Sequence, residues 1–189
     1  RIEFKELMNT VKLTTVFSSS DPEDAFSLAD KVAIIHDGRI IQYDVKDAVY
    51  NHPVDLFTGS YFGYPEMNFC DCEVVEKGGD MAFDAQCIVV PVKNETFKKS
   101  LKRGPNYSLG IRPEHIKVSE VPPSGGTLCE GSLVLTEVVG SDTIVHVNLG
   151  RDTFEVFTPG IYRQEIGKTL YVSFDPSTFY LFNKETGKL

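Results

Sequence analysis

Residues 14–42 read Thr-Thr-Val-Phe-Ser-Ser-Ser-Asp-Pro-Glu-Asp-Ala-Phe-Ser-Leu-Ala-Asp-Lys-Val-Ala-Ile-Ile-His-Asp-Gly-Arg-Ile-Ile-Gln. The β-branched and aromatic residues Thr14–Phe17 predict a short buried strand. Asp21 and Pro22 predict the start of a helix over 22–31, because aspartate is a preferred N-cap and proline fits the first helical position.

Two apolar runs follow, at 32–36 and 40–43, and they flank an Asp-Gly pair. Such a pair between two apolar runs is typical of a β-hairpin. Strand, helix and strand in the order 14–17, 22–31 and 32–36 predict a parallel crossover, the building unit of an α/β sheet.

The pattern of the sequence changes near Asn68. Before it, residues 1–9 and 44–50 predict two further helices. Beyond it, short strands alternate with turns rich in Gly, Pro, Asn and Asp. We therefore expect two domains, an α/β part at 1–68 and an all-β part at 69–189. A small barrel or sandwich fits the second part, and an OB-like barrel is favoured. The expected strands are Phe69–Val75, Met81–Val90, Tyr107–Arg112, Gly131–Val139, Thr143–Leu149, Thr153–Phe157, Thr169–Phe174 and Phe179–Phe182.

The composition argues against several classes of function. The 189 residues carry 19 Lys and Arg against 27 Asp and Glu, a net charge of −8, so the chain gains no counterion-release attraction to nucleic acid. No apolar run reaches the roughly 18–20 residues that span a bilayer. The chain starts without Met and without a secretory signal, and we interpret it as a piece of a longer protein. No Cys-x-x-Cys pair occurs among Cys70, Cys72, Cys87 and Cys129, which indicates reduced thiols in a cytosolic protein.

Three stretches carry a resemblance to a known family: residues 14–42, residues 51–69 (Asn-His-Pro-Val-Asp-Leu-Phe-Thr-Gly-Ser-Tyr-Phe-Gly-Tyr-Pro-Glu-Met-Asn-Phe) and residues 108–116 (Ser-Leu-Gly-Ile-Arg-Pro-Glu-His-Ile). The first resembles the segment after the Walker B strand in the ATP-binding subunits of ABC transporters, and the second resembles the end of their nucleotide-binding domain. The third is similar to the signature of their C-terminal regulatory OB-type domain, called TOBE. The chain is most similar to the carbohydrate and glycerol-phosphate importer class, which includes the maltose importer.

The resemblance implies a fold and a role. Residues 1–68 would be the C-terminal portion of a nucleotide-binding domain, and residues 69–189 an OB-fold/TOBE regulatory domain. The complete protein would bind ATP and Mg²⁺, and would pair with a second ATP-binding subunit, identical or different. It would act on transmembrane permease subunits, receive regulatory proteins, and lie in the cytoplasm on the inner face of the plasma membrane. The resemblance also assigns Ser108, Gly110, Arg112 and Glu114 to a regulatory or subunit-contact surface.

The family motifs for phosphoryl transfer are missing from these 189 residues. No Gly-x-x-x-x-Gly-Lys-Ser/Thr phosphate loop, no Walker B acids and no Leu-Ser-Gly-Gly-Gln signature occur. The family places a histidine, the switch residue that contacts the γ-phosphate, where this chain has Ser20. Serine neither carries a positive charge nor accepts a proton near neutral pH. We therefore expect this chain to supply dimerisation and regulation, with a degenerate switch position at Ser20, and not to hydrolyse ATP by itself.

One alternative function is a stand-alone OB-like module that binds a small oxyanion or an oligosaccharide. The hydroxyls of Ser18–Ser20 before a helix would suit a phosphate, although capping explains them more simply. The same preference for a structural role holds for His36, His52 and His146, which we do not interpret as metal ligands. It also holds for the basic cluster at 98–103, interpreted as a solvated loop, and for the aromatic residues at 171–182, interpreted as core.

Overall fold

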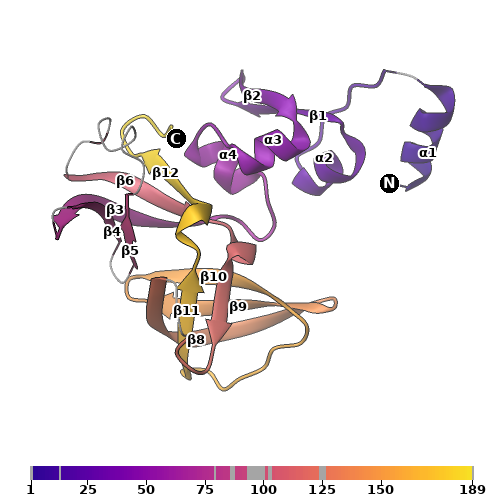
Figure 1. Ribbon diagram of the computed structural model, residues 1–189. Coiled ribbons are helices and arrows are strands. Elements are labelled where there is room, and N and C mark those ends of the chain that lie inside the picture. Colours follow the sequence, from indigo (N-terminus) through magenta and orange to yellow (C-terminus); the bar gives the residue numbers. More distant parts are fainter. Residues whose placement is uncertain are drawn as a thin grey trace. The chain divides into compact units, whose positions relative to one another are not determined.

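The chain divides into two units, residues 1–63 and residues 64–189, as seen in the computed structural model (Figure 1). The structure describes residues 2–12, 14–78, 80–85, 88–92, 101, 104–123 and 127–188. The change of sequence pattern predicts a domain boundary near Asn68. The chain divides between Gly63 and Tyr64 instead, and Asn68 is the first residue of the first strand in the second unit.

The first unit contains four helices and one hairpin among its described residues. Its elements are α1 (Ile2–Val11), α2 (Pro22–Leu28), β1 (Lys31–His36), β2 (Arg39–Val45), α3 (Lys46–Asn51) and α4 (Leu56–Tyr61). The side chain of Asp21 caps α2 by accepting a hydrogen bond from the backbone N–H of Glu23 at 2.9 Å, as the sequence predicts. In the hairpin turn, Asp37 and Gly38 have φ values of +48° and +71°, which the primed turns of two-residue hairpins require.

The predicted strand at Thr14–Phe17 is wrong, and with it the parallel crossover. These four residues belong to no helix or strand, and β1 pairs with β2 alone in an antiparallel sheet. The side chain of Val16 is 94% exposed. A β-branched run forms a strand only when a neighbouring strand takes up its N–H and C=O groups, and the described part of this unit supplies none for it.

The core of the first unit is small. Its buried apolar residues come from β1, α3 and the end of α4: Val32, Ile34, Val49 and Phe62. Other large apolar side chains of the hairpin stay in water, among them Ile35 (63% exposed), Ile40 (64%) and Tyr43 (63%). This unit therefore presents much apolar surface for its size.

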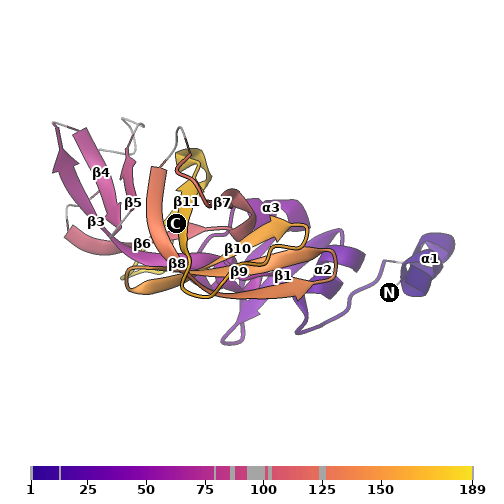
Figure 2. The ribbon, with the colours of Figure 1, turned by 90° about the horizontal axis from the view of Figure 1, so that it is seen from below.

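The second unit is built from antiparallel strands in two sheets (Figures 1 and 2). One sheet has the order β12-β6-β3-β4-β5 and the other the order β10-β9-β8-β11-β7. The strands are β3 (Asn68–Lys77), β4 (Asp80–Ala85), β5 (Ile88–Pro91), β6 (Gly104–Ile111), β7 (Ile116–Ser119), β8 (Thr127–Val139), β9 (Asp142–Leu149), β10 (Asp152–Pro159), β11 (Thr169–Phe174) and β12 (Phe179–Asn183), with short 3-10 turns η1 (Pro113–His115) and η2 (Pro176–Thr178).

All eight predicted strands of this unit are present, with two differences. The stretch Met81–Val90 is divided between β4 and β5, and the sequence analysis missed β7. One apolar core joins both sheets and includes Cys70, Leu109, Val145, Phe154 and Leu170. The expected fold class, a part with helices and strands followed by an OB-like all-β part, is confirmed, except that the first part contains an antiparallel hairpin and not the expected parallel crossover.

Candidate functional site

The loop before α2 is held by local hydrogen bonds. The hydroxyl of Ser19 donates to the Oδ2 of Asp24 at 2.7 Å and accepts from the backbone N–H of Asp21 at 3.0 Å. The Asp21 side chain caps α2. Ser19 and Asp21, two of the four polar residues in the run Ser18–Asp21, therefore stabilise the start of this helix. The capping interpretation of this run is therefore confirmed.

Ser20, the predicted switch position, is exposed at the tip of this loop. Its backbone carbonyl accepts a hydrogen bond from the hydroxyl of Tyr61, at the end of α4, at 2.9 Å. This hydrogen bond connects the loop before α2 with a residue 41 positions later in the chain, and nothing in the sequence indicates it.

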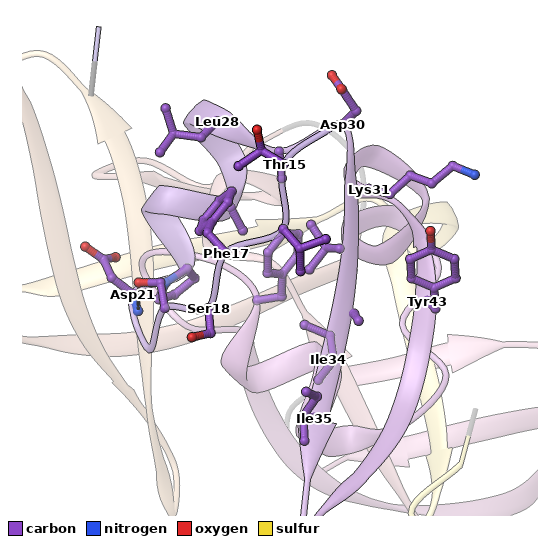
Figure 3. Close-up of a pocket in the computed structure, with 18 of the residues that line it drawn as sticks. Thr15, Phe17, Ser18, Asp21, Leu28, Asp30, Lys31, Ile34, Ile35 and Tyr43 are labelled. Atoms are coloured by element: carbon purple, nitrogen blue, oxygen red, sulfur yellow. Dashed lines mark hydrogen bonds between the residues drawn. The ribbon is translucent and has the colours of Figure 1, made fainter. Parts of the chain in front are cut away.

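A hollow of about 920 Å³ lies beside this loop, between residues 14–19, α2 and β1 (Figure 3). Phe17, Leu28 and Ile34 line it with apolar groups. At one side, the ammonium group of Lys31 lies 5.7 Å from the centroid of the Tyr43 ring. The lining is mainly apolar and offers no cluster of charged groups for a phosphate, so we interpret the hollow as a surface for protein packing.

The four residues assigned to a regulatory surface differ in exposure. Ser108 and Arg112 are buried, at 7% and 0% exposure, whereas Glu114 is exposed. At Gly110, in β6, a Cβ atom would lie 2.6 Å from the sulfur of Met67 and 3.0 and 3.2 Å from ring atoms of Phe182 and Phe69. Of the four, only Glu114 is exposed.

Arg112 and Glu114 lie at the start of a turn that follows β6, and not in a strand. Arg112 precedes the 3-10 turn η1, and its carbonyl accepts a hydrogen bond from the N–H of His115 at 3.0 Å. Pro113 at the first position of η1 fixes the backbone there. The turn buries the arginine and leaves the glutamate at the surface.

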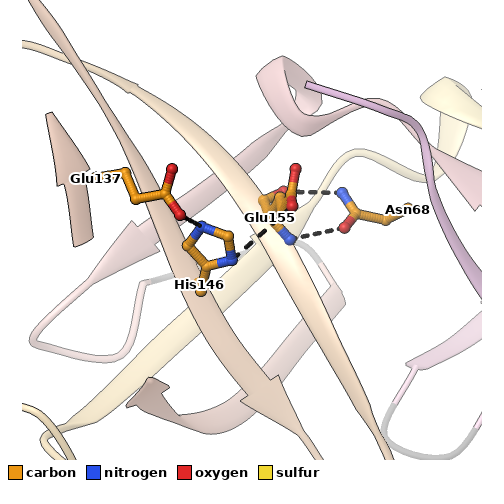
Figure 4. A network of polar contacts seen from close by, with 4 residues as sticks. All are labelled: Asn68, Glu137, His146 and Glu155. Atoms are coloured by element: carbon orange, nitrogen blue, oxygen red, sulfur yellow. Dashed lines mark hydrogen bonds and ion pairs between the residues drawn. The ribbon is translucent and has the colours of Figure 1, made fainter. Parts of the chain in front are cut away.

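A polar network that the sequence analysis missed joins the two sheets of the second unit (Figure 4). The side-chain amide of Asn68 donates to the carbonyl of Glu155 at 2.8 Å and accepts from its N–H at 2.7 Å. On the other side of β10, the Nδ1 of His146 lies 3.9 Å from the Oε1 of Glu155, and its Nε2 lies 3.1 Å from the Oε1 of Glu137. The histidine is 15% exposed and sits between two carboxylates.

The described cysteines and histidines do not form a metal centre. Within the described ranges, no group of three or more His, Cys, Asp and Glu side chains is placed to hold a metal ion. Cys70, Cys72 and Cys129 are buried thiols that form no disulfide. Burial, with a smaller effect from the Asp71 carboxylate, raises the pKa of the Cys72 thiol to about 12, so this thiol stays protonated and inert. Cys87 lies outside the described residues.

Other predicted features have structural roles or fall outside the described residues. His36 stacks on Phe57, and the carbonyl of His52 accepts a hydrogen bond from the Gln42 side chain. Phe174 and Phe182 are buried, at 3% and 0% exposure, as the core interpretation predicts. Residues 98–100, 102 and 103 of the basic cluster lie outside the described residues. No helix in the described part of the chain is long and apolar enough to cross a membrane.

Comparison with known protein families separates the two functions that the sequence suggests, a part of an importer ATP-binding subunit and a stand-alone binding module. Residues 63–116 match the family model of the MalK OB fold domain, and residues 109–182 match that of the TOBE domain. Each match covers less than half of the chain, and together the two span most of the second unit. The first match covers β3 to η1, and the second runs from the end of β6 into β12. The resemblance drawn from the sequence is therefore confirmed.

Curated relatives extend the match to both units. The sulfoquinovosyl glycerol transport ATP-binding protein SmoE of Agrobacterium fabrum is 32% identical over 98% of this chain and 51% of its own length. The maltose/maltodextrin import ATP-binding protein MalK of Photorhabdus laumondii is 28% identical over 98% of this chain and 50% of its own length. The trehalose/maltose import ATP-binding protein MalK of Thermococcus litoralis is 29% identical over 100% of this chain and 51% of its own length. The chain spans about half the length of the curated relatives it matches, and it corresponds to their C-terminal part.

Among solved structures, the molybdate-binding protein ModG aligns with 60% of this chain and 94% of that chain at 12% identity. Its TM-score of 0.47 is too low to carry a functional argument. The family matches and the curated relatives, and not this likeness, are the reason why the alternative of a stand-alone oxyanion or oligosaccharide module is not favoured.

Proposed function

We propose that this chain works as the C-terminal part of the ATP-binding subunit of an ABC importer for a sugar or a glycerol-phosphate compound. The observation that carries the proposal is the order of the two family matches, which together cover residues 63–182. Relatives named as sugar-import ATP-binding proteins align with 98–100% of the chain. Function in such a protein comes from the site and the partners, not from the fold alone.

In this proposal the two parts of the chain have different tasks. Residues 1–68 complete a nucleotide-binding domain, and residues 69–189 supply dimerisation and regulation. The partners would be a second ATP-binding subunit, the transmembrane permease subunits and a regulatory protein, with the complete protein on the inner face of the plasma membrane. Glu114 supports the regulatory task because it is exposed beside a turn that the buried Arg112 anchors.

The apolar surface of the first unit supports the same assignment. The hollow beside β1 and the exposed side chains of Val16 and Ile35 would be costly in a free-standing protein. Each would be covered if further strands of the same domain packed there. We therefore expect residues 1–68 to be stable only with additional sequence of that domain or through pairing with another copy.

The nucleotide would be held mainly by residues outside this chain. ATP and Mg²⁺ supply the phosphoryl group and the charge neutralisation of the reaction, and the lysine and hydroxyl that bind them belong to a phosphate loop that these 189 residues do not contain. The contribution of this chain is the loop that carries Ser20. Its hydroxyl is able to hydrogen-bond a water or a phosphate oxygen but not to take up a proton as an imidazole does.

The proposal is tested on the protein expressed from its complete gene. Its intact mass should lie well above the 21.1 kDa of this chain, it should bind ATP, and it should co-purify with permease subunits. A mass of 21.1 kDa together with no ATP binding would overturn the assignment.

The role of Ser20 has a separate test in the same protein. Ser20→His should raise ATP hydrolysis by about tenfold or more, because an imidazole restores a proton acceptor at the switch position. Ser18→His, in the same exposed loop, is the matched control and should leave hydrolysis unchanged. Equal rates for both variants would refute the switch assignment while leaving the family assignment intact.

A further inference from the structure

A stack of three rings runs through the first unit. The His36 ring, at the end of β1, lies 3.9 Å from the ring of Phe57 with an interplanar angle of 26°. The Phe57 ring in turn lies 5.6 Å from the ring of Tyr61, nearly parallel at 8°. Offset-stacked rings restrict each other's rotation. The Tyr61 ring is therefore held in place by Phe57, which is itself stacked on His36 of the hairpin.

The stack ends in a hydrogen bond to the loop that carries Ser20. The Tyr61 hydroxyl donates to the Ser20 carbonyl at 2.9 Å, and the next N–H along the chain, that of Asp21, donates to the Ser19 hydroxyl at 3.0 Å. The Ser20 carbonyl and the Asp21 N–H belong to one planar peptide group. That group is therefore held at both of its polar ends, one of them by a residue from a different helix.

Tyr61 also has a special place in the chain. It is the last residue of α4, and the second unit begins three positions later, at Tyr64. The N–H of Phe62 continues the last turn of α4 by bonding the carbonyl of Thr58 at 3.1 Å. The residue that holds the loop thus belongs to the helix that leads into the second unit.

We propose that Tyr61 is a positioning residue for the Ser20–Asp21 peptide group, and that the stack of His36, Phe57 and Tyr61 ties the loop before α2 to α4. The proposal deepens the proposed function, because it names how the switch position would depend on the helix that leads to the regulatory part. The physical link itself is a property of the described residues and does not depend on nucleotide binding.

Hydrogen exchange of single backbone amides, measured by NMR on the protein expressed from its complete gene, tests the link. Tyr61→Phe keeps the stacked ring and removes only the hydroxyl. The Asp21 amide should then exchange about fivefold faster, the change that the net value of one neutral hydrogen bond corresponds to. The Ala29 amide donates to the Ala25 carbonyl at the far end of α2, and its exchange rate should not change. The midpoint temperature of thermal unfolding should also stay the same.

Two further variants complete the test. Tyr43→Phe removes an exposed hydroxyl from the hairpin of the same unit and should leave the Asp21 amide unchanged. Phe57→Leu removes the middle ring of the stack and should speed Asp21 exchange while Tyr61 keeps its hydroxyl.

Three results would overturn the proposal. The first is an Asp21 amide that is already unprotected in the parent chain. The second is a Tyr61→Phe variant in which the Asp21 and Ala29 amides both exchange faster to the same extent, which would mean a general structural role for Tyr61. The third is a Tyr43→Phe variant that speeds exchange of the Asp21 amide as much as Tyr61→Phe does. The ATP-binding experiments above are independent of each of these results, so the proposed function and this link fail separately.

Discussion

The side chain of Asn68 satisfies both backbone polar groups of Glu155, a residue 87 positions later in the chain. Asn68 opens β3 in one sheet, and Glu155 lies in β10, at the edge of the other sheet. An edge strand has N–H and C=O groups without a strand partner on one side. One amide side chain therefore closes an edge and fastens the two sheets of the second unit to each other.

We predict that Asn68→Ala lowers the free energy of unfolding of the second unit by about 2–4 kcal/mol, because it leaves two partly buried backbone groups without partners. Asn68→Asp keeps the acceptor and loses the donor, so it should also lower the free energy of unfolding, either by less than Asn68→Ala does or by more. Urea unfolding followed by circular dichroism measures the change. Asn148→Ala, at an exposed position of β9, is the control and should stay within about 0.5 kcal/mol. Equal effects of the two alanine variants would contradict the bracing role of Asn68.

Two glycines of the second unit differ in what surrounds them. A Cβ atom at Gly131 would lie 2.6 Å from the backbone oxygen of Asn148 and 2.5 Å from a methyl carbon of Leu149. At Gly110 the nearest atom is the flexible side-chain sulfur of Met67, at 2.6 Å. A side chain can rotate away, whereas a paired backbone cannot shift without breaking the sheet.

Gly131→Ala should therefore destabilise the second unit more than Gly110→Ala, by about 3 kcal/mol or more against about 1–3 kcal/mol. Thermal unfolding of both variants beside the parent chain measures the order. A reversed order would mean that Met67 is less able to move than its side-chain chemistry suggests. A Gly110→Ala variant that unfolds as the parent does would show that the side chains of Met67, Phe69 and Phe182 make room for a methyl group without loss of stability.

The thiol of Cys72 should be chemically silent in the folded protein. With its pKa raised to about 12 by burial and by Asp71, Cys72 holds about 500-fold less thiolate at pH 9 than an ordinary cysteine. Because the pKa is higher in the folded state, the stabilisation from the neutral thiol is present below about pH 9 and is lost as the pH rises toward 12.

Alkylation by iodoacetamide at pH 9, mapped by mass spectrometry, checks the silence of Cys72. The folded chain should remain unlabelled at this residue, and the chain in urea should be labelled at all four cysteines. Rapid labelling of Cys72 under native conditions would show that β3 opens locally.

Local chemistry explains which parts of the fold could be predicted from the sequence. The hairpin and the start of α2 follow from Asp37-Gly38 and from Asp21, whose effects act within a few residues. The strand expected at Thr14–Phe17 was wrong because strand formation depends on a partner strand, which residue propensity does not supply.

The candidate sites were harder to predict for the same reason. The resemblance assigns Ser108, Gly110 and Arg112 to a contact surface, yet Ser108 and Gly110 lie in β6, which runs between β12 and β3, and Arg112 directly follows it. Burial at these positions is a property of the whole sheet. The bonds from Asn68 to Glu155 and from Tyr61 to Ser20 join residues 87 and 41 positions apart. No spacing rule along one sequence indicates such pairs.

Thr143 carries the last prediction. It is fully buried at 0% exposure, and its hydroxyl donates to the carbonyl of Gly160 at 2.8 Å and accepts from the N–H of Tyr162 at 3.0 Å. These two bonds hold the segment after β10 against β9. Thr143→Val keeps the shape of the side chain but leaves both backbone groups without a partner, so it should cost about 2–3 kcal/mol.

Thr153→Val, at an exposed position of β10, makes the same chemical change where water replaces the lost bonds, and it should cost less than about 0.5 kcal/mol. Hydrogen exchange should show the difference locally, with the Tyr162 amide losing its protection in Thr143→Val alone. A protected Tyr162 amide in that variant would mean that another group holds the segment, and that the buried hydroxyl is not what fixes the chain after β10.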